Sequence, residues 1–226
     1  MKKAAYLFMA LMIGGTMAQA KDSTKAELDK DESMKLSYMV GMDVGKSLKQ
    51  MPSKVDIDVV ATGMTSAYAG KADVYTEAEV MAFKQDYFKR MQKKEGDENV
   101  AKGKAFLEEN KKKAGVKVTA SGLQYEVVKQ GNGATPKATD TVKVHYKGTL
   151  IDGTEFDSSY KRGQPATFPV NGVIKGWTEA LQLMKVGDTF KLVIPSELAY
   201  GERGAGGMIG PNSVLVFDVE LLAIEK

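Results

Sequence analysis

The 226-residue sequence contains no cysteine and only one histidine, His145. A chain without cysteine forms no disulfide and cannot be a thiol oxidoreductase. One histidine alone does not make a zinc site, which usually needs three or four protein ligands. Because His145 alternates with the apolar residues Val144 and Tyr146, we expect it to face solvent, where it could not activate Ser158 or Ser159. The composition therefore argues against metal, thiol and serine-nucleophile chemistry, and it calls for no cofactor.

The sequence also lacks an apolar run long enough to span a membrane. Residues 4–13 are apolar, but Gly14 and Gly15 interrupt them well short of the roughly 20 residues that a spanning helix needs. Lys2 and Lys3 precede this run, and the small residues around position 20 are typical of a cleavage site. We therefore expect residues 1–20 to be a signal peptide and the mature protein to be periplasmic. No cysteine follows the cleavage site, so no lipid anchor on a mature N-terminal cysteine is expected.

Neither charge sign dominates the mature chain. Removing Lys2 and Lys3 leaves 30 basic and 29 acidic residues, so the protein is not expected to bind nucleic acid. The glycine-rich stretch at residues 201–207 lacks the spacing of a phosphate-binding loop, which argues against a nucleotide site.

The chain divides into two halves that differ in the spacing of their apolar residues. Residues 21–115 show helical spacing, and residues 116–226 alternate with a period of two and contain frequent glycine and proline. In the first half one helix is expected to end at Pro52, a second is expected over about residues 58–69 before Gly70, and a third should begin with a capping box at Thr76 and Glu79. The third helix could run to Lys113, with a possible break at Gly96 or Gly103.

The helical half buries little by itself. Leu36, Val40, Val44 and Leu48 form one apolar stripe, and Gly41 and Gly45 would let a second helix approach closely. A second copy of the chain is the simplest partner for these faces, so we expect a homodimer through the N-terminal helices.

The second half predicts short antiparallel strands around residues 123–128, 142–147, 190–194 and 215–221, with one short helix at Trp177 to Met184. The fold class is therefore α+β, with a twisted sheet packed on a helix behind an all-helical domain. On alternation alone the aromatic residues of this half are as well explained by a hydrophobic core as by a binding site.

Four motifs resolve this ambiguity. The stretches VKVHYKGTLIDGTEFDSS, VIKGWTEALQLMKVGD, LAYGERGAGG and VLVFDVELL occur in an order and spacing that resemble the FK506-binding-protein (FKBP) family of peptidyl-prolyl isomerases, over about residues 121–226. The stretches LSYMVGMDVGKSL and FLEENKKKAGV are similar to the dimerising helical domain of the macrophage-infectivity-potentiator branch, whose periplasmic members also act as chaperones.

The resemblance implies a bent antiparallel sheet wrapped around a short helix, with an apolar pocket between them. It assigns catalytic positions to Asp157, Tyr146, Phe156 and Tyr200, the last as a hydrogen-bond donor to a bound carbonyl. It assigns substrate-binding positions to Trp177 as the pocket floor and to the residues around it, Phe168, Val173, Ile174, Ile209 and Phe217. Ala166 and Ala205 replace bulkier residues of some members, which bears on the affinity for a macrolide ligand of the FK506 type.

The function implied is a periplasmic prolyl isomerase that accelerates the folding of proline-containing secreted polypeptides, with associated chaperone activity. Rotation about the X-Pro bond needs no nucleophile, because an apolar pocket favours the less polar twisted amide. The alternative is a dimeric holdase chaperone that uses the pocket only for binding. A third reading, an interaction scaffold built on the helical half alone, leaves the aromatic set unexplained.

Overall fold

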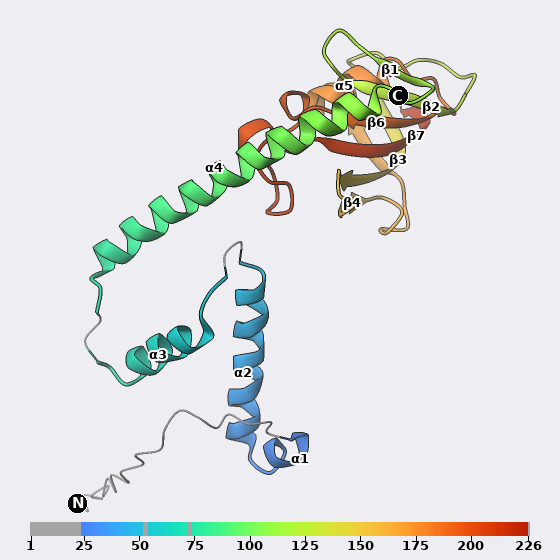
Figure 1. Cartoon of the computed structure of the whole chain (residues 1–226). Helices are drawn as coiled ribbons and strands as arrows, with labels where there is room; N and C mark the ends of the chain where they lie inside the picture. Colours follow the sequence, from blue (N-terminus) through green and yellow to red (C-terminus); the bar gives the residue numbers. More distant parts are fainter. Residues whose placement is uncertain (1–23, 52–53, 72–73, 226) are drawn as a thin grey trace, which may run out of the picture. The chain divides into compact units, whose positions relative to one another are not determined.

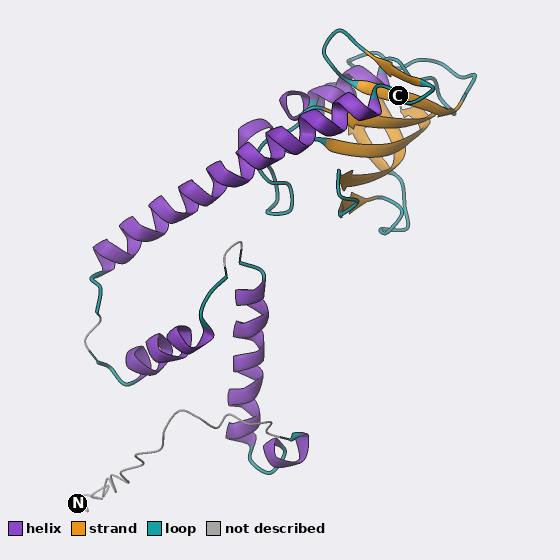
Figure 2. Cartoon of the chain, viewed as in Figure 1, coloured by secondary structure: helices purple, strands orange, loops and turns teal. Residues whose placement is uncertain are grey.

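The computed structural model describes residues 24–51, 54–71 and 74–225. Its contacts divide the chain into two compact units, Met1–Val74 and Tyr75–Lys226. Figures 1 and 2 show that the described part of the first unit is helical and that the second combines one long helix with a sheet. The expected signal peptide, residues 1–20, and the proline expected to end the first helix, Pro52, lie outside the described residues.

The first unit contains α1 (Lys25–Leu28), α2 (Glu32–Lys49) and α3 (Ile57–Tyr68). Asp31 and Asp56 cap α2 and α3 by accepting backbone N–H groups of the first turn, which would otherwise lack partners. Gly70 follows α3 with φ +63°, which confirms its predicted position just past the helix. No described residue of the three helices is buried. Their apolar side chains therefore have no core within this unit of a single chain.

The second unit begins with α4 (Glu77–Asn110), which is continuous over 34 residues. Thr76 and Glu79 form the predicted capping box, and the helix passes through Gly96 and Gly103 without a break. The N-terminal half of α4 has no buried residue, whereas Gly96, Gly103 and Asn110 in the C-terminal half are buried. The glycines are tolerated because that half is supported by the sheet beside it.

Seven antiparallel strands follow: β1 (Val116–Val118), β2 (Gln124–Lys129), β3 (Thr141–Leu150), β4 (Glu155–Ser158), β5 (Ala166–Pro169), β6 (Thr189–Ile194) and β7 (Leu215–Glu225). Their order across the sheet is β1-β2-β6-β7-β3-β4, and β5 pairs with the start of β3. The long β3 and β7 pair along almost their whole length and form the centre of the sheet. Bulges interrupt the register of three strand pairs, which bends the sheet.

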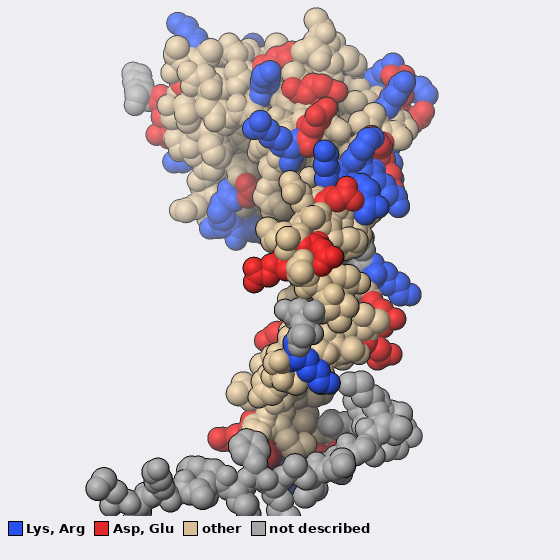
Figure 3. All heavy atoms as spheres, turned by 90° about the vertical axis from the view of Figure 1, so that its left-hand side faces the viewer, with Lys and Arg blue, Asp and Glu red and all other residues tan. Residues whose placement is uncertain are grey.

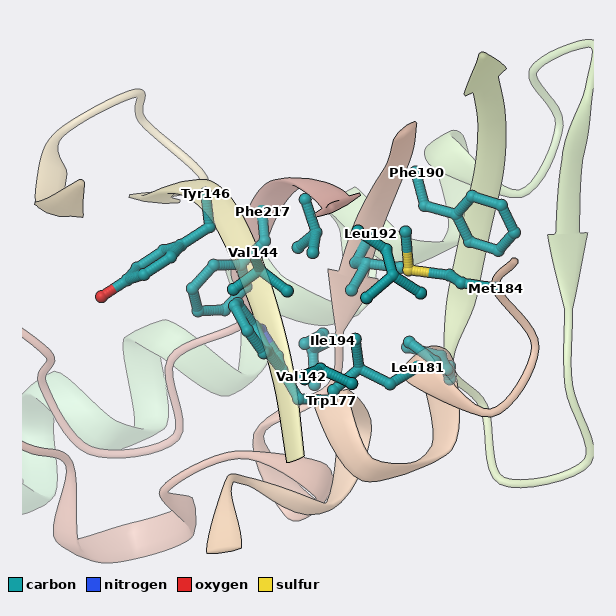
Figure 4. Close-up of a cluster of buried hydrophobic side chains, with 14 of the residues drawn as sticks. Val142, Val144, Tyr146, Trp177, Leu181, Met184, Phe190, Leu192, Ile194 and Phe217 are labelled. Atoms are coloured by element: carbon teal, nitrogen blue, oxygen red, sulfur yellow. The ribbon is translucent and has the colours of Figure 1, made fainter. Parts of the chain in front are cut away.

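The short helix α5 (Lys175–Leu181) lies against this sheet. A Cβ on Gly176 would come within 2.5 Å of Ile194, so glycine is what allows the helix to approach β6 so closely. Figure 4 shows Trp177 and Leu181 of α5 packed with side chains of β3, β6 and β7. In the described residues every buried hydrophobic side chain lies at or after Leu123, so the only core is in this half. The predicted α+β class is confirmed.

One local expectation is corrected by the structure. His145 does not simply face solvent: it is partly buried, stacks on Tyr160 with ring centroids 4.6 Å apart, and its Nδ1 lies 2.9 Å from Oγ of the buried Ser159. Gln124 on β2 is 3% exposed because its side chain bonds to Asn110 and to the carbonyl of Leu107 on α4. The division by contacts falls between Val74 and Tyr75, and the domain boundary predicted near residue 115 lies where α4 gives way to β1.

Candidate active site

A cavity of about 430 Å³ opens between α5 and the bent sheet. This volume is within the range of small-molecule and peptide pockets. Nine of the ten predicted site residues line it; the lining is Tyr146, Phe156, Asp157, Phe168, Gly172, Val173, Ile174, Trp177, Tyr200 and Phe217. The exception is Ile209, which is buried in the adjoining core cluster.

The floor of the cavity is a cluster of rings set edge to face around Trp177. The Trp177 ring lies 5.2 Å from that of Tyr146 and 5.3 Å from that of Phe217, with interplanar angles of 90° and 80°. Phe168 completes the cluster at 6.0 Å from Trp177. Edge-to-face contacts of this kind favour rigid placement of the rings. The buried indole N–H of Trp177 has no hydrogen-bond partner within the part of the chain that the structure describes.

A glycine in the middle of β3 makes room for the aromatic wall. Gly148 pairs with Asp157 on β4 and with Phe217 on β7, and a Cβ at this position would lie 2.7 Å from the rings of Phe156 and Phe217. The two rings instead meet edge to face at 5.5 Å across the glycine. The local sequence Lys147-Gly148-Thr149 thus brings the wall residues of two different strands together.

The charged edge of the cavity is a network of Asp157, Tyr146 and Arg162. The Tyr146 hydroxyl donates to one carboxylate oxygen of Asp157, and Arg162 pairs with the other. Arg162 also donates to the Tyr146 hydroxyl at 2.8 Å, with its guanidinium carbon 5.4 Å from the centre of the Tyr146 ring. Figure 4 shows the hydroxyl of Tyr146 pointing away from the buried cluster. Asp157 is therefore held in place by two donors at the cavity edge.

This network keeps the carboxylate charged and the phenol neutral. Partial burial by itself would raise the pKa of Asp157, but the hydrogen bonds from Tyr146 and Arg162 outweigh it and lower the pKa. Burial raises the pKa of Tyr146, and its hydrogen bond to Asp157 raises it further against the opposing effect of Arg162. At neutral pH the site therefore contains an ionised carboxylate paired with the Arg162 cation, and a neutral Tyr146 hydroxyl that donates to this carboxylate and accepts from Arg162.

Arg162 was not among the residues predicted from the sequence. It lies in the loop after β4, where no periodicity indicates which way a side chain points. The only available signal was an arginine five residues after a carboxylate that needs a partner. Tyr200, by contrast, lines the cavity as predicted, and the residue is 42% exposed.

Ser159 ties the network to the backbone of β3. It is fully buried, its Oγ accepts the N–H of Tyr146 at 2.8 Å, and it lies next to His145. This placement gives Ser159 a structural task, since its hydroxyl is already committed to Tyr146 and His145. Among the described residues no group of three or more His, Cys, Asp or Glu side chains is arranged to hold a metal ion.

Comparison with known proteins decides the family. Residues 132–222 match the family model described as FKBP-type peptidyl-prolyl cis-trans isomerase, and residues 33–127 match the domain amino terminal to it. The chain belongs to the FKBP-type peptidyl-prolyl cis-trans isomerase family. The resemblance stated from the four motifs is thereby confirmed, and the protein is an isomerase of this type.

The relatives match the FKBP chain over both halves. The outer membrane protein MIP of Legionella longbeachae is 45% identical, with 100% of this chain and 98% of that protein covered. The isomerase Mip of Coxiella burnetii is 44% identical over 98% of this chain and 96% of its own length. FkpA of Escherichia coli is 46% identical over 92% of this chain and 81% of its own length.

Solved FKBP structures agree with the fold. The crystal structure of FkpA from Escherichia coli superposes with a TM-score of 0.64 at 45% identity, covering 87% of this chain and 98% of that one. An isomerase from Pseudomonas syringae matches with a TM-score of 0.54 at 42% identity, covering 57% of this chain and 96% of its own. The arrangement of a helical region followed by a sheet domain is therefore shared with the Mip and FkpA type of FKBP.

Proposed function

We propose that this isomerase acts in the periplasm on the X-Pro bonds of unfolded or partly folded polypeptides, and that catalysis takes place in the Trp177 cavity. The observation that carries the proposal is the combination of an aromatic floor with a single fixed carboxylate at its edge. The cavity is large enough for a proline ring and its neighbouring residues.

The proposed mechanism follows from the electronic structure of the amide. The planar X-Pro bond has partial double-bond character, with a barrier of about 18–20 kcal/mol to rotation. When the bond twists, resonance is lost and the carbonyl becomes less polar, so an apolar and water-poor cavity stabilises the twisted state relative to the planar one. The proline ring packs on Trp177, surrounded by Phe168, Val173, Ile174 and Phe217, with Ile209 supporting this wall from the core.

The polar groups then orient the substrate. The Tyr200 hydroxyl donates a hydrogen bond to a substrate carbonyl, and Phe156 and Asp157 border the rotating amide. Asp157 transfers no proton, because its carboxylate is already occupied by Tyr146 and Arg162. Its fixed charge instead faces the amide, whose carbon–oxygen dipole decreases as the bond twists. A macrolide of the FK506 type would compete for the same cavity.

The proposal is tested by the cis-to-trans rate of a short Ala-Leu-Pro-Phe peptide in the presence of the purified mature chain. We expect Asp157→Ala to lower kcat/KM about tenfold, because a charged group at the reacting bond is lost. Asp218→Ala is the matched control, since this exposed aspartate on β7 follows Phe217 but does not line the cavity. An Asp157→Ala variant with wild-type turnover would contradict this site.

We also propose that the protein is a homodimer with chaperone activity. Large apolar side chains on α2 are exposed to between 45% and 64%: Met34, Leu36, Tyr38, Met39, Val40 and Met42. Faces of this kind on a soluble chain mark a protein–protein interface. On α4, Phe83 stacks on Tyr87 at 5.7 Å while remaining 64% exposed, which offers an aromatic surface for apolar segments of a client.

The holdase alternative is distinguished by measuring two activities on the same protein. Suppression of client aggregation that persists in Asp157→Ala, together with lost peptide turnover, would separate chaperoning from isomerisation. A folded wild-type chain that suppresses aggregation but accelerates no peptide would favour the holdase.

Among the described residues no helix is both long and apolar enough to cross a membrane. The periplasmic location is tested by fractionating cells and sequencing the N-terminus of the mature protein, which we expect to begin at Lys21.

A further inference from the structure

One face of α4 carries small and amide side chains where the helix meets the sheet. Gly96, Gly103 and Asn110 are buried and lie seven residues apart, two helical turns each, and Asn99 is partly buried on the same face. We call these four residues the α4 seam. None of them lines the cavity, and the seam has no role in the mechanism proposed above.

The seam brings the helix backbone onto the chain segment that precedes β7. A Cβ on Gly103 would lie 2.8 Å from Cγ2 of Val214, and a Cβ on Gly96 would lie 3.2 Å from Asn212 and 3.3 Å from Pro211. The first distance is too short for any side chain without movement of a neighbour. The helix therefore fits this segment at a distance that only glycine permits.

Asn99 makes the directional contact within the seam. Its Nδ2 donates to the carbonyl of Pro211 at 2.8 Å and lies 3.4 Å from Oγ of Ser213. Pro211 belongs to a tight turn, in which Ser213 Oγ donates to the carbonyl of Gly210 at 2.8 Å. Asn212 in this turn has φ +57°, the one positive value outside glycine among the described residues, so the turn needs support from its surroundings.

The turn is joined to the cavity wall. The backbone N–H of Asn212 donates to the carbonyl of Gly201 at 2.8 Å, and Gly201 follows Tyr200 directly. On the other side, Ile209 exchanges two backbone hydrogen bonds with Ala205 at 2.8 and 3.0 Å. The loop that carries Tyr200 is thus closed by the turn that Asn99 holds.

We propose that Asn99 is a positioning residue for prolyl isomerisation, which acts through the turn at residues 210–213 on Tyr200. The helix fixes the carbonyl of Pro211, the turn fixes Gly201, and the hydroxyl of Tyr200 is held at the height of the substrate carbonyl. The proposal rests on the function proposed for the cavity and on the role of Tyr200 in it. It makes α4 a part of the catalytic unit as well as a link to the N-terminal helices.

The chain contains a matched control on the same seam. The side chain of Asn110 also donates a hydrogen bond from α4 to the sheet, at 2.9 Å to Oε1 of Gln124. Asn110 is 7% exposed. Its partner is on β2 and is not part of the turn at residues 210–213. Asn110→Ala therefore removes an equivalent contact of the helix without touching the turn.

The experiment uses the full mature chain and a double-mutant cycle of Asn99→Ala with Tyr200→Phe. We expect Asn99→Ala to raise KM for the peptide about three- to tenfold with a smaller change in kcat, since a misplaced donor weakens binding of the carbonyl. When Tyr200 is already Phe, adding Asn99→Ala should raise KM by less than a further twofold, because the hydroxyl that Asn99 positions is already absent. Asn110→Ala should lower the denaturation midpoint while kcat and KM stay within twofold of wild type.

Two further measurements keep the test decisive. Ser213→Ala loosens the same turn without a substitution in α4, because it removes the hydrogen bond to the Gly210 carbonyl and the second acceptor of Asn99. We expect it to raise KM, as Asn99→Ala does. The fluorescence of Trp177, the only tryptophan in the chain, reports whether the cavity floor is intact in each variant. An unchanged emission maximum together with a raised KM is expected for a positioning effect.

Three results would overturn the proposal. Full additivity of Asn99→Ala and Tyr200→Phe would show that Asn99 does not act through Tyr200. Equal kinetic losses in Asn99→Ala and Asn110→Ala would show a general effect of docking the helix. Wild-type turnover in Tyr200→Phe would contradict the role of Tyr200 and therefore this proposal. If Asp157→Ala still loses turnover in the same assay, the function proposed for the cavity holds even though the role of Asn99 does not.

Discussion

The helices of the first unit and the sheet of the second differ in how far their apolar side chains are buried. In the sheet unit Val142, Val144 and Leu215 are fully buried, whereas on α2 Leu36 and Val40 are 64% and 51% exposed. Both regions have regular secondary structure with well-formed caps, so the difference lies in the core and not in the local folding. A helix with an exposed apolar face obtains its stability from a partner, and a sheet wrapped around α5 obtains it from its own chain.

Within the second unit, charged side chains have different roles along α4 and at the cavity edge. Figure 3 shows Lys, Arg, Asp and Glu side chains mixed over one face of the molecule, and along α4 they form pairs such as Lys93 with Asp97. These exposed pairs contribute little to stability because water screens them. The network of Asp157, Tyr146 and Arg162 is instead set at the cavity edge, where it orients functional groups. Charged side chains along α4 thus pair with one another at the surface, whereas those at the site fix its geometry.

A charge on the apolar stripe of α2 should have the most visible effect, because it should change the number of copies in the assembly. Val40→Glu would place a carboxylate in the proposed dimer interface, at a cost of about 3 kcal/mol, which is more than a hundredfold in the dimer dissociation constant. Analytical ultracentrifugation of the mature chain should show two copies in the wild type and one in the variant. Lys46→Glu, on a polar position of the same helix, should stay dimeric. A dimeric Val40→Glu would mean that this face is not the interface.

A core substitution should affect the sheet unit alone. Trp177→Ala should cost about 3–5 kcal/mol of unfolding free energy, because a large buried ring is replaced by a cavity. Leu183→Ala, at a side chain that is 44% exposed just after α5, should cost less than about 0.5 kcal/mol. Urea unfolding followed by circular dichroism measures both free energies. Tryptophan fluorescence cannot be used, because Trp177→Ala removes the one tryptophan of the sequence. If the helical signal of the first unit moves with the sheet, the two units do not unfold independently.

Two glycine-to-alanine substitutions should change the free energy of unfolding in opposite directions. Gly63→Ala on α3 meets no atom within 4 Å and should stabilise its helix by up to about 1 kcal/mol. Gly103→Ala should destabilise by about 1–3 kcal/mol, because the new methyl group overlaps Val214. Adding Val214→Ala, which removes the overlapping atom, should recover part of the loss in a double-mutant cycle. Stabilisation by Gly103→Ala alone would contradict the close docking of α4.

The smallest effect concerns pH. The pKa of Asp157 is lowered on folding, so its ionised form stabilises the protein above about pH 4, and this contribution is lost as the pH falls through the lowered pKa. We expect less than about 1 kcal/mol, since the side chain is 42% exposed and solvent screens the pair. Comparing unfolding free energies at pH 5 and pH 2.5 should show a smaller loss in Asp157→Asn than in the wild type. An equal loss would assign the acid sensitivity to other carboxylates.

Much of the fold and most of the candidate site could be predicted from the sequence. The capping box at Thr76, the glycine after α3 and the alternation of β3 are local signals, and each has a local cause in hydrogen bonding or side-chain direction. The cavity residues were found through motifs whose spacing resembles a family, because alternation alone does not separate a pocket from a core. Ile209 shows that limit, since it lies in the core cluster beside the cavity and not in its lining.

The features that were missed depend on contacts between distant parts of the chain. Arg162 became part of the site because a loop of no regular period returns to Asp157, and Gln124 became buried because α4 covers it. His145 was expected to face solvent, but the neighbouring strand and loop bring Ser159 and Tyr160 against it. None of these pairings leaves a periodic trace in the sequence.

By itself the sequence determined which segments form helices and strands, which side chains are apolar, and that no cysteine is available for thiol chemistry. The tertiary structure alone decided that Gly96 and Gly103 continue a helix and dock it instead of breaking it, and that Asp157 has two partners that keep it charged. The physical reason is that propensity and periodicity act over a few neighbouring residues. Burial, close approach and the pKa of a side chain depend on whichever residues the folded chain brings beside it.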